Sequence, residues 1–152
     1  MKKLSLIFLL MILYTFTYAT EMQDDGLYFK KTISGDFSEI TLRVKNALKT
    51  QGFSVITEID MDKKLNEKLN IDVKPYKILG ACNPGYAYKT LQIDDNIGVF
   101  LPCKIVLKQL GEGQVEVVSI NPSMMMQMLD NEELTKVAEE VSIKLKTVID
   151  NL

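Results

Sequence analysis

The chain has 152 residues, a formal net charge of −2, two cysteines and no histidine. This mild acidity argues against nucleic acid as a partner, because binding to phosphates needs a basic face. The lack of histidine excludes a Ser-His-Asp triad, a histidine general base and a His-ligated zinc site. The length suits a single domain that buries its own core.

Residues 1–19 have the pattern of a secretory signal peptide. Lys2 and Lys3 precede the apolar run 4–14, and Ala19 ends the segment at a suitable cleavage position. The run is short for a membrane span, which needs roughly 20 apolar residues. We therefore expect a periplasmic or secreted domain over residues 20–152 that makes no membrane contact once the signal is removed. The alternative, that the segment is kept as an anchor, stays open.

Alternating apolar residues and turn signals predict five strands, and helical spacing predicts the segments between them. The expected strands cover residues 27–33, 53–59, 76–82, 103–110 and 114–120. The expected helices follow Asp36 and end at Gly52, cover 62–69 and 85–91, and close the chain from about Asp130. This order predicts an α+β fold in which helices pack on one face of a small antiparallel sheet.

The closing helix shows the clearest pattern in the chain. Asp130 followed by Glu133 indicates a capped start. One apolar stripe then recurs at helical spacing and predicts the buried face of the helix. Its members are Leu134, Val137, Ala138, Val141, Leu145, Val148, Ile149 and Leu152.

The two cysteines lie where one predicted strand ends and another begins. Cys103 shares a strand face with Ile105, opposite Lys104, so its side chain should point toward apolar surroundings. Antiparallel pairing of the two strands would bring Cys103 close to Cys82, which makes the pair a candidate disulfide. An exported protein meets the oxidising conditions in which such a bond forms.

A predicted helix start lies directly after Cys82. Asn83 is a favoured N-cap residue and Pro84 suits the first helical position. A thiol just before the positive end of a helix can have a lowered pKa. Asn121-Pro122 repeats the device after a later strand, which is consistent with a cleft. The candidate ligand-binding residues are Cys82, Asn83, Pro84, Pro102 and Cys103.

Sulfur side chains also make a copper(I) site conceivable without histidine. Thiolate and thioether sulfurs suit copper(I) better than carboxylates do. The candidate metal ligands are Cys82, Cys103, Met124 and Met126. Packing in the core is the alternative role of the methionines. The run Asp94-Asp95-Asn96 is expected to form a helix-ending turn, since a calcium site needs more oxygen ligands in register.

The cysteine region contains the ordered blocks Gly-Ala-Cys-Asn-Pro at 80–84, Ile-Gly at 97–98 and Leu-Pro-Cys at 101–103. In these blocks the chain resembles the domain of unknown function 302 family, and the resemblance covers nearly all of the mature chain. It implies the small TATA-binding-protein-like fold, strand-helix-four strands-helix, without implying DNA binding. Family members without export signals carry the same cysteine blocks, which weakens the interpretation that the pair is only a structural disulfide.

The expected function is binding of a small ligand or metal ion at a cleft around the two cysteines, rather than catalysis. One alternative is a thiol-dependent redox protein in which Cys82 attacks and Cys103 resolves. Another is a module that binds a protein partner and holds a purely structural disulfide. The sequence leaves open the identity of the ligand, any catalytic residue, the redox state of the thiols and the oligomeric state.

Overall fold

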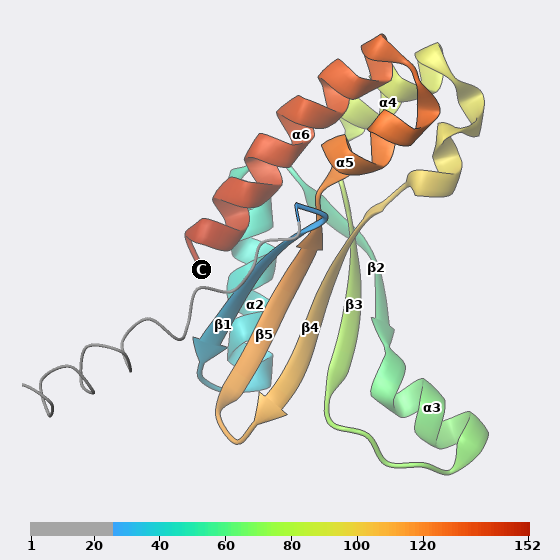
Figure 1. The fold of residues 1–152 in the computed structure, drawn as a ribbon. Helices are drawn as coiled ribbons and strands as arrows, with labels where there is room; N and C mark the ends of the chain where they lie inside the picture. The colour runs from blue at the N-terminus through green and yellow to red at the C-terminus, as the bar shows by residue number, and fades with distance from the viewer. Residues whose placement is uncertain (1–25) are drawn as a thin grey trace, which may run out of the picture.

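The computed structural model describes residues 26–152 of the chain. The predicted signal segment, residues 1–19, lies outside the described residues. Within the described part, no helix is both long enough and apolar enough to cross a membrane. The fold is α+β, as predicted: an antiparallel sheet with helices (Figure 1).

The predicted strands are all present, with bounds that differ from the expected ones by a residue or so. They are β1 (Tyr28–Ser34), β2 (Ser54–Asp60), β3 (Tyr76–Cys82), β4 (Cys103–Gly111) and β5 (Gln114–Ile120). The helices are α2 (Phe37–Thr50), α3 (Met61–Leu69), α4 (Pro84–Ile93), α5 (Pro122–Met126) and α6 (Glu132–Asp150). Two short 3-10 helices, η1 (Asp95–Phe100) and η2 (Gln127–Leu129), complete the set.

The five strands form one sheet in the order β1-β5-β4-β3-β2, with every neighbouring pair antiparallel. The central pairing of β3 with β4 sets the cysteine region, because it places Ala81 directly opposite Cys103. Residues opposite each other in a ladder share a face of the sheet. Cys82 lies one residue beyond this pair, at the end of its strand.

Helices α2 and α6 cover one face of the sheet and bury the core against it (Figure 1). The stripe predicted for the closing helix lies on this buried side, because apolar side chains at helical spacing form one face. The core of the sheet side is contributed mainly by Leu79, Ala81, Ile105, Leu107, Val115 and Val117, all fully buried. The apolar stripe of α6 and the core-facing side chains of the strands therefore pack together in a single layer between the sheet and the helices.

A second, smaller apolar cluster lies beyond one end of the strands, where α4, η1 and α5 pack against the first half of α6 (Figure 1). We call these elements the helical cap. Its buried centre consists of Ile97, Met126, Leu134 and Ala138. The cap extends the core past the end of the sheet, and the site described below lies between the two.

The start of one predicted helix and the cap hydrogen bond of another differ from the structure. The N-cap of α6 is Asn131, whose side chain accepts hydrogen bonds from two backbone amides, whereas Asp130 precedes it in a left-handed conformation. Asn121 makes no side-chain cap for α5. Its amide instead donates to the carbonyl of Gly26, and its side-chain oxygen accepts from the hydroxyl of Ser123. Helix α5 still starts after Asn121-Pro122 as predicted, but these partners engage the side chain of Asn121 in place of the cap hydrogen bonds.

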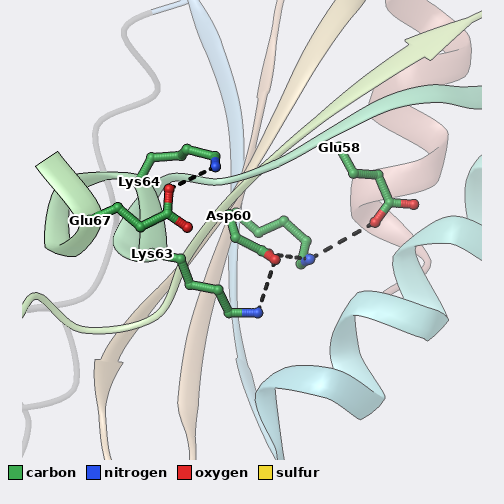
Figure 2. Close-up of polar contacts among 6 residues, drawn as sticks. Glu58, Asp60, Lys63, Lys64 and Glu67 are labelled. Carbon is green, nitrogen blue, oxygen red and sulfur yellow. Dashed lines mark hydrogen bonds and ion pairs between the residues drawn. The ribbon is translucent and has the colours of Figure 1, made fainter.

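The edge of the sheet formed by β2 holds a cluster of charged side chains (Figure 2). Lys77 lies 2.5 Å from Asp60 and 3.9 Å from Glu58, and Lys63 lies 3.1 Å from Asp60. Hydrogen bonds from Lys77 and Lys63 lower the pKa of Asp60. We call this set the β2–α3 ion-pair cluster. Its opposite charges are paired side chain to side chain.

Candidate ligand cavity

A cavity of about 340 Å³ lies between the sheet and the helical cap. Its walls are largely apolar and come from segments far apart in the sequence. Helix α4 contributes Tyr86, Ala87 and Thr90; helix α6 contributes Leu134, Val137, Ala138 and Val141; and η1 contributes Ile97, Val99 and Phe100. The strand residues include Cys82, Cys103, Val106, Val118 and Ile120. A volume of this size falls in the range of small-molecule sites in proteins.

Asn83 fixes the wall of the cavity formed by α4. Its side-chain oxygen accepts from the amides of Gly85 at 3.1 Å and Tyr86 at 3.3 Å, as the predicted N-cap requires. Its side-chain nitrogen donates to the carbonyl of Gly52 at 2.9 Å, which ties the helix start to the turn before β2. This turn needs the left-handed backbone that glycine adopts at position 52. Asn83 therefore positions α4 from both sides.

The two cysteines both line this cavity, and both are free thiols. Alternation places Ala81, rather than Cys82, on the core face opposite Cys103. Cys82 still reaches the cavity, because its strand ends there and the chain turns into α4. The structure thus brings the two predicted residues to one site, while the disulfide between them stays a prediction.

Burial raises the pKa of both thiols. The pKa of Cys103 rises to about 11, with neighbouring Cys82 adding to the shift and Lys104 opposing it. Desolvation also raises the pKa of Cys82, in the direction opposite to the one expected from the helix start after it. A thiol with a raised pKa is a poor nucleophile near neutral pH. This environment disfavours the redox reading, in which Cys82 would attack.

Not every predicted site residue lines the cavity. Pro84 occupies the first turn of α4, outside the lining. Pro102 also lies outside it and packs over β3, where a Cβ added at Gly80 would overlap Pro102 and Thr57. The two predicted prolines therefore lie next to the thiol-bearing segments, Pro84 just after Cys82 and Pro102 just before Cys103, without lining the cavity.

The methionines of the run do not all face the cavity, because their side chains project from different sides of α5. Met126 lines the cavity as predicted for a site residue, and Met125 lines it too. Met124 is 39% exposed and is not part of the lining. The predicted ligand set of two cysteines with Met124 and Met126 is therefore not brought together. Within residues 26–152, no group of three or more His, Cys, Asp or Glu side chains is placed to hold a metal ion.

Two further residues of the cavity bear on its chemistry. Tyr86 of α4 lies in the wall, near the carboxylate of Glu140 of α6. Burial and this carboxylate together raise the pKa of Tyr86. Lys104, the residue after Cys103, also lines the cavity. Strand alternation assigned Lys104 correctly to the solvent side, but it gave no sign that a cavity opens there.

The fold and the site together define a small α+β domain in which a helical cap encloses an apolar, thiol-containing cavity at one end of an antiparallel sheet. The chain belongs to the family "Domain of unknown function DUF302", whose model matches residues 29–152. This confirms the resemblance seen in the cysteine blocks.

A similar solved structure is the crystal structure of an uncharacterized conserved DUF302 protein from Bacillus stearothermophilus. It is 30% identical and has a TM-score of 0.75; the match covers 82% of this chain and 96% of that one. No curated protein matches the chain.

Proposed function

We propose that this protein is an exported binding protein that holds a small apolar molecule in the cavity between the sheet and the helical cap. The observation that supports this most is the cavity itself: about 340 Å³ walled by side chains that are mostly aliphatic or aromatic. Burial of apolar surface is the main source of affinity for such ligands.

The polar groups in the wall support binding more than catalysis. Thr90 donates its hydroxyl to the carbonyls of Tyr86 and Ala87, so it is engaged within its own helix. Asn83 is engaged with three backbone groups. The thiols are protonated near neutral pH because their pKa values are raised. None of these four wall residues is thus prepared to act as a base or as a strong nucleophile.

The test is a titration with the neutral fluorescent probe N-phenyl-1-naphthylamine. The wild-type protein should bind one probe molecule. Ala87→Leu adds side-chain volume inside the cavity and should weaken binding at least tenfold. Tyr88→Leu is the matched control, because Tyr88 neighbours Ala87 on α4 but is 67% exposed and outside the lining.

Thermal unfolding of each variant shows whether it is folded. An absence of probe binding by the wild-type protein, or unchanged binding by a folded Ala87→Leu variant, would contradict the proposal. Native mass spectrometry of the protein purified from its own compartment, with and without reduction, identifies a retained ligand and the state of the thiols in the same experiment.

Copper(I) is a second candidate ligand, favoured by the gathering of sulfur in one cavity. Cys82, Cys103, Met125 and Met126 all line it. Binding would displace the thiol protons, since thiolate is the ligating form. Competition with the copper(I) chelator bathocuproine disulfonate, under anaerobic reducing conditions, tests this candidate. Loss of competition in Cys82→Ser would support it, and equal behaviour of the variant and the wild-type protein would exclude it.

A further inference from the structure

The lining of the cavity has an uneven distribution of charge. Among residues 26–152, Lys104 is the one charged side chain in the wall, and no carboxylate is part of it. An apolar cavity edged by a single cation differs from a purely apolar one, because it can distinguish ligands by the charge at one end. This difference bears on the class of ligand.

Lys104 makes no ion pair within the described part of the chain. Its ammonium donates to the backbone carbonyl of Pro102 at 2.7 Å. On the same face of the same strand, Lys108 lies 2.5 Å from Glu116. A lysine ammonium has three donors, so Lys104 keeps capacity for an anion while the charge of Lys108 is already compensated. Lys104 directly follows Cys103 in β4, and its positive charge acts to lower the pKa of that thiol against the larger effect of burial.

The mouth of the cavity can be located from residues that line it and yet face solvent. Val99 of η1 is 82% exposed, and Tyr28 of β1 is 36% exposed. Lys104 is exposed as well. The lining also includes Val106 and its cross-strand partner Val118, which lie on the sheet face opposite the core. The cavity therefore opens onto that face, and Lys104 stands where it opens.

The volume sets the length of a chain that fits. A methylene group occupies about the volume of a water molecule, roughly 30 Å³. A cavity of about 340 Å³ then holds an unbranched chain of about ten to twelve carbons. A longer chain would have to extend past the mouth, over the open face of the sheet.

We infer that the ligand is an anionic amphiphile with a single medium-length alkyl chain, such as a fatty-acid carboxylate, whose chain fills the cavity and whose anionic head pairs with Lys104. This inference rests on the proposed function, because it assigns a class of ligand to the same cavity. A charge-assisted hydrogen bond at the rim fixes the orientation of the ligand, and the apolar wall provides the rest of the affinity.

The experiment compares three ten-carbon probes by isothermal titration below their micelle concentrations: decanoate, 1-decanol and decyltrimethylammonium. Decanoate should bind tightest and the cation weakest. Lys104→Gln should weaken decanoate roughly tenfold and leave 1-decanol unchanged. Lys108→Gln, the matched control on the same strand face, should alter neither.

A series of carboxylates from six to fourteen carbons tests the fit to the cavity. Affinity should rise about fourfold for each added methylene and level off near twelve carbons. Decyl phosphate separates the possible sources of the head group: equal binding of phosphate and carboxylate shows that Lys104 recognises charge alone, whereas preference for the carboxylate assigns a fatty acid.

Equal binding of decanoate and 1-decanol, with no effect of Lys104→Gln, would overturn this inference and leave the proposed function intact. Failure of all the ten-carbon probes and of N-phenyl-1-naphthylamine would instead overturn the proposed function and this inference together. The two failures are therefore distinguishable.

Discussion

Strand β3 connects two regions with opposite chemistry. Near its start, Lys77 joins the β2–α3 ion-pair cluster with Asp60 and Glu58 (Figure 2). At its end, Cys82 enters the apolar cavity beneath the helical cap. The first region pairs its opposite charges across β2, α3 and β3. The second gathers apolar walls around protonated thiols, with the unmatched cation Lys104 at its rim.

The comparison shows how to separate a structural charge from a charge available to a ligand. In the cluster, a lysine and a carboxylate satisfy each other, and such partly exposed pairs contribute little to stability, typically below about 1 kcal/mol. At the cavity, the groups that stabilise the fold are apolar, and the charge of Lys104 is not paired with a carboxylate of the described residues. Substitutions should therefore be costly in the cavity wall and mild in the cluster.

The largest effect is expected for Val141→Asp in the cavity wall. Val141 is 7% exposed and packs in the core, so the substitution buries a carboxylate without a partner and should destabilise the fold by more than about 3 kcal/mol. Ile143→Asp is the matched control on α6, because Ile143 is 68% exposed. Urea unfolding measures both variants, and a loss for Val141→Asp as small as that for Ile143→Asp would mean that the cavity wall tolerates charge.

A smaller effect is expected from the ionisation of Cys103. Its pKa is about 11 in the folded protein, against roughly 8.5 in an unfolded chain. The unfolded state therefore loses the thiol proton first as the pH rises. The stability that this thiol contributes is complete below its unfolded pKa, and it is lost as the pH rises toward the folded pKa.

Urea unfolding of the wild-type protein and of Cys103→Ala, under reducing conditions from pH 8 to pH 11, measures this contribution. Lysines and tyrosines titrate in both proteins, so their effect cancels in the difference. The difference in unfolding free energy between the two should decrease with pH by roughly 3 kcal/mol. A difference that stays constant over this range would show that Cys103 is more solvated than its place beside the core indicates.

The smallest effect is expected for Asp60→Asn in the ion-pair cluster. The loss at neutral pH should stay below about 1 kcal/mol, because the carboxylate is partly exposed. Hydrogen bonds from Lys77 and Lys63 lower its pKa, so this contribution is present above the unfolded pKa and disappears as the pH falls through the folded one. Unfolding at neutral and acidic pH checks this; a loss as large as that of Val141→Asp would end the contrast between the regions.

The fold was predictable because its signals are local and repeated. The alternation in each strand and the stripe of α6 indicate which side of an element is buried, and the short turn between β4 and β5 indicates their antiparallel pairing. The cap at Asn83 was predictable for the same reason. The start of α5 was also predictable from Asn121-Pro122, but the engagement of Asn121 with Gly26 and Ser123, in place of a cap hydrogen bond, was not. The cap of α6 was not predictable, because Asn131 adjoins an equally suitable aspartate.

The site was predictable only in part. The strand ends placed Cys82, Asn83 and Cys103 together, since each lies beside a turn that the sequence shows. The run of methionines is uniform, so nothing in it indicates which side of α5 is buried, and Met124 was chosen where Met125 lines the cavity. The position of Lys104 at the mouth depends on how the cap sits beyond the sheet, and this is a tertiary feature without a sequence signal.

The exposure of Val99 at the mouth has a consequence for spectroscopy. The chain contains no tryptophan, so light absorbed at the red edge of the protein spectrum excites no indole in the native sequence. Val99 is 82% exposed and still lines the cavity, and an indole ring at this position has room on the solvent side. Val99→Trp would therefore place one tryptophan at the mouth, and the wavelength of its fluorescence emission would report whether water or a ligand occupies the entrance.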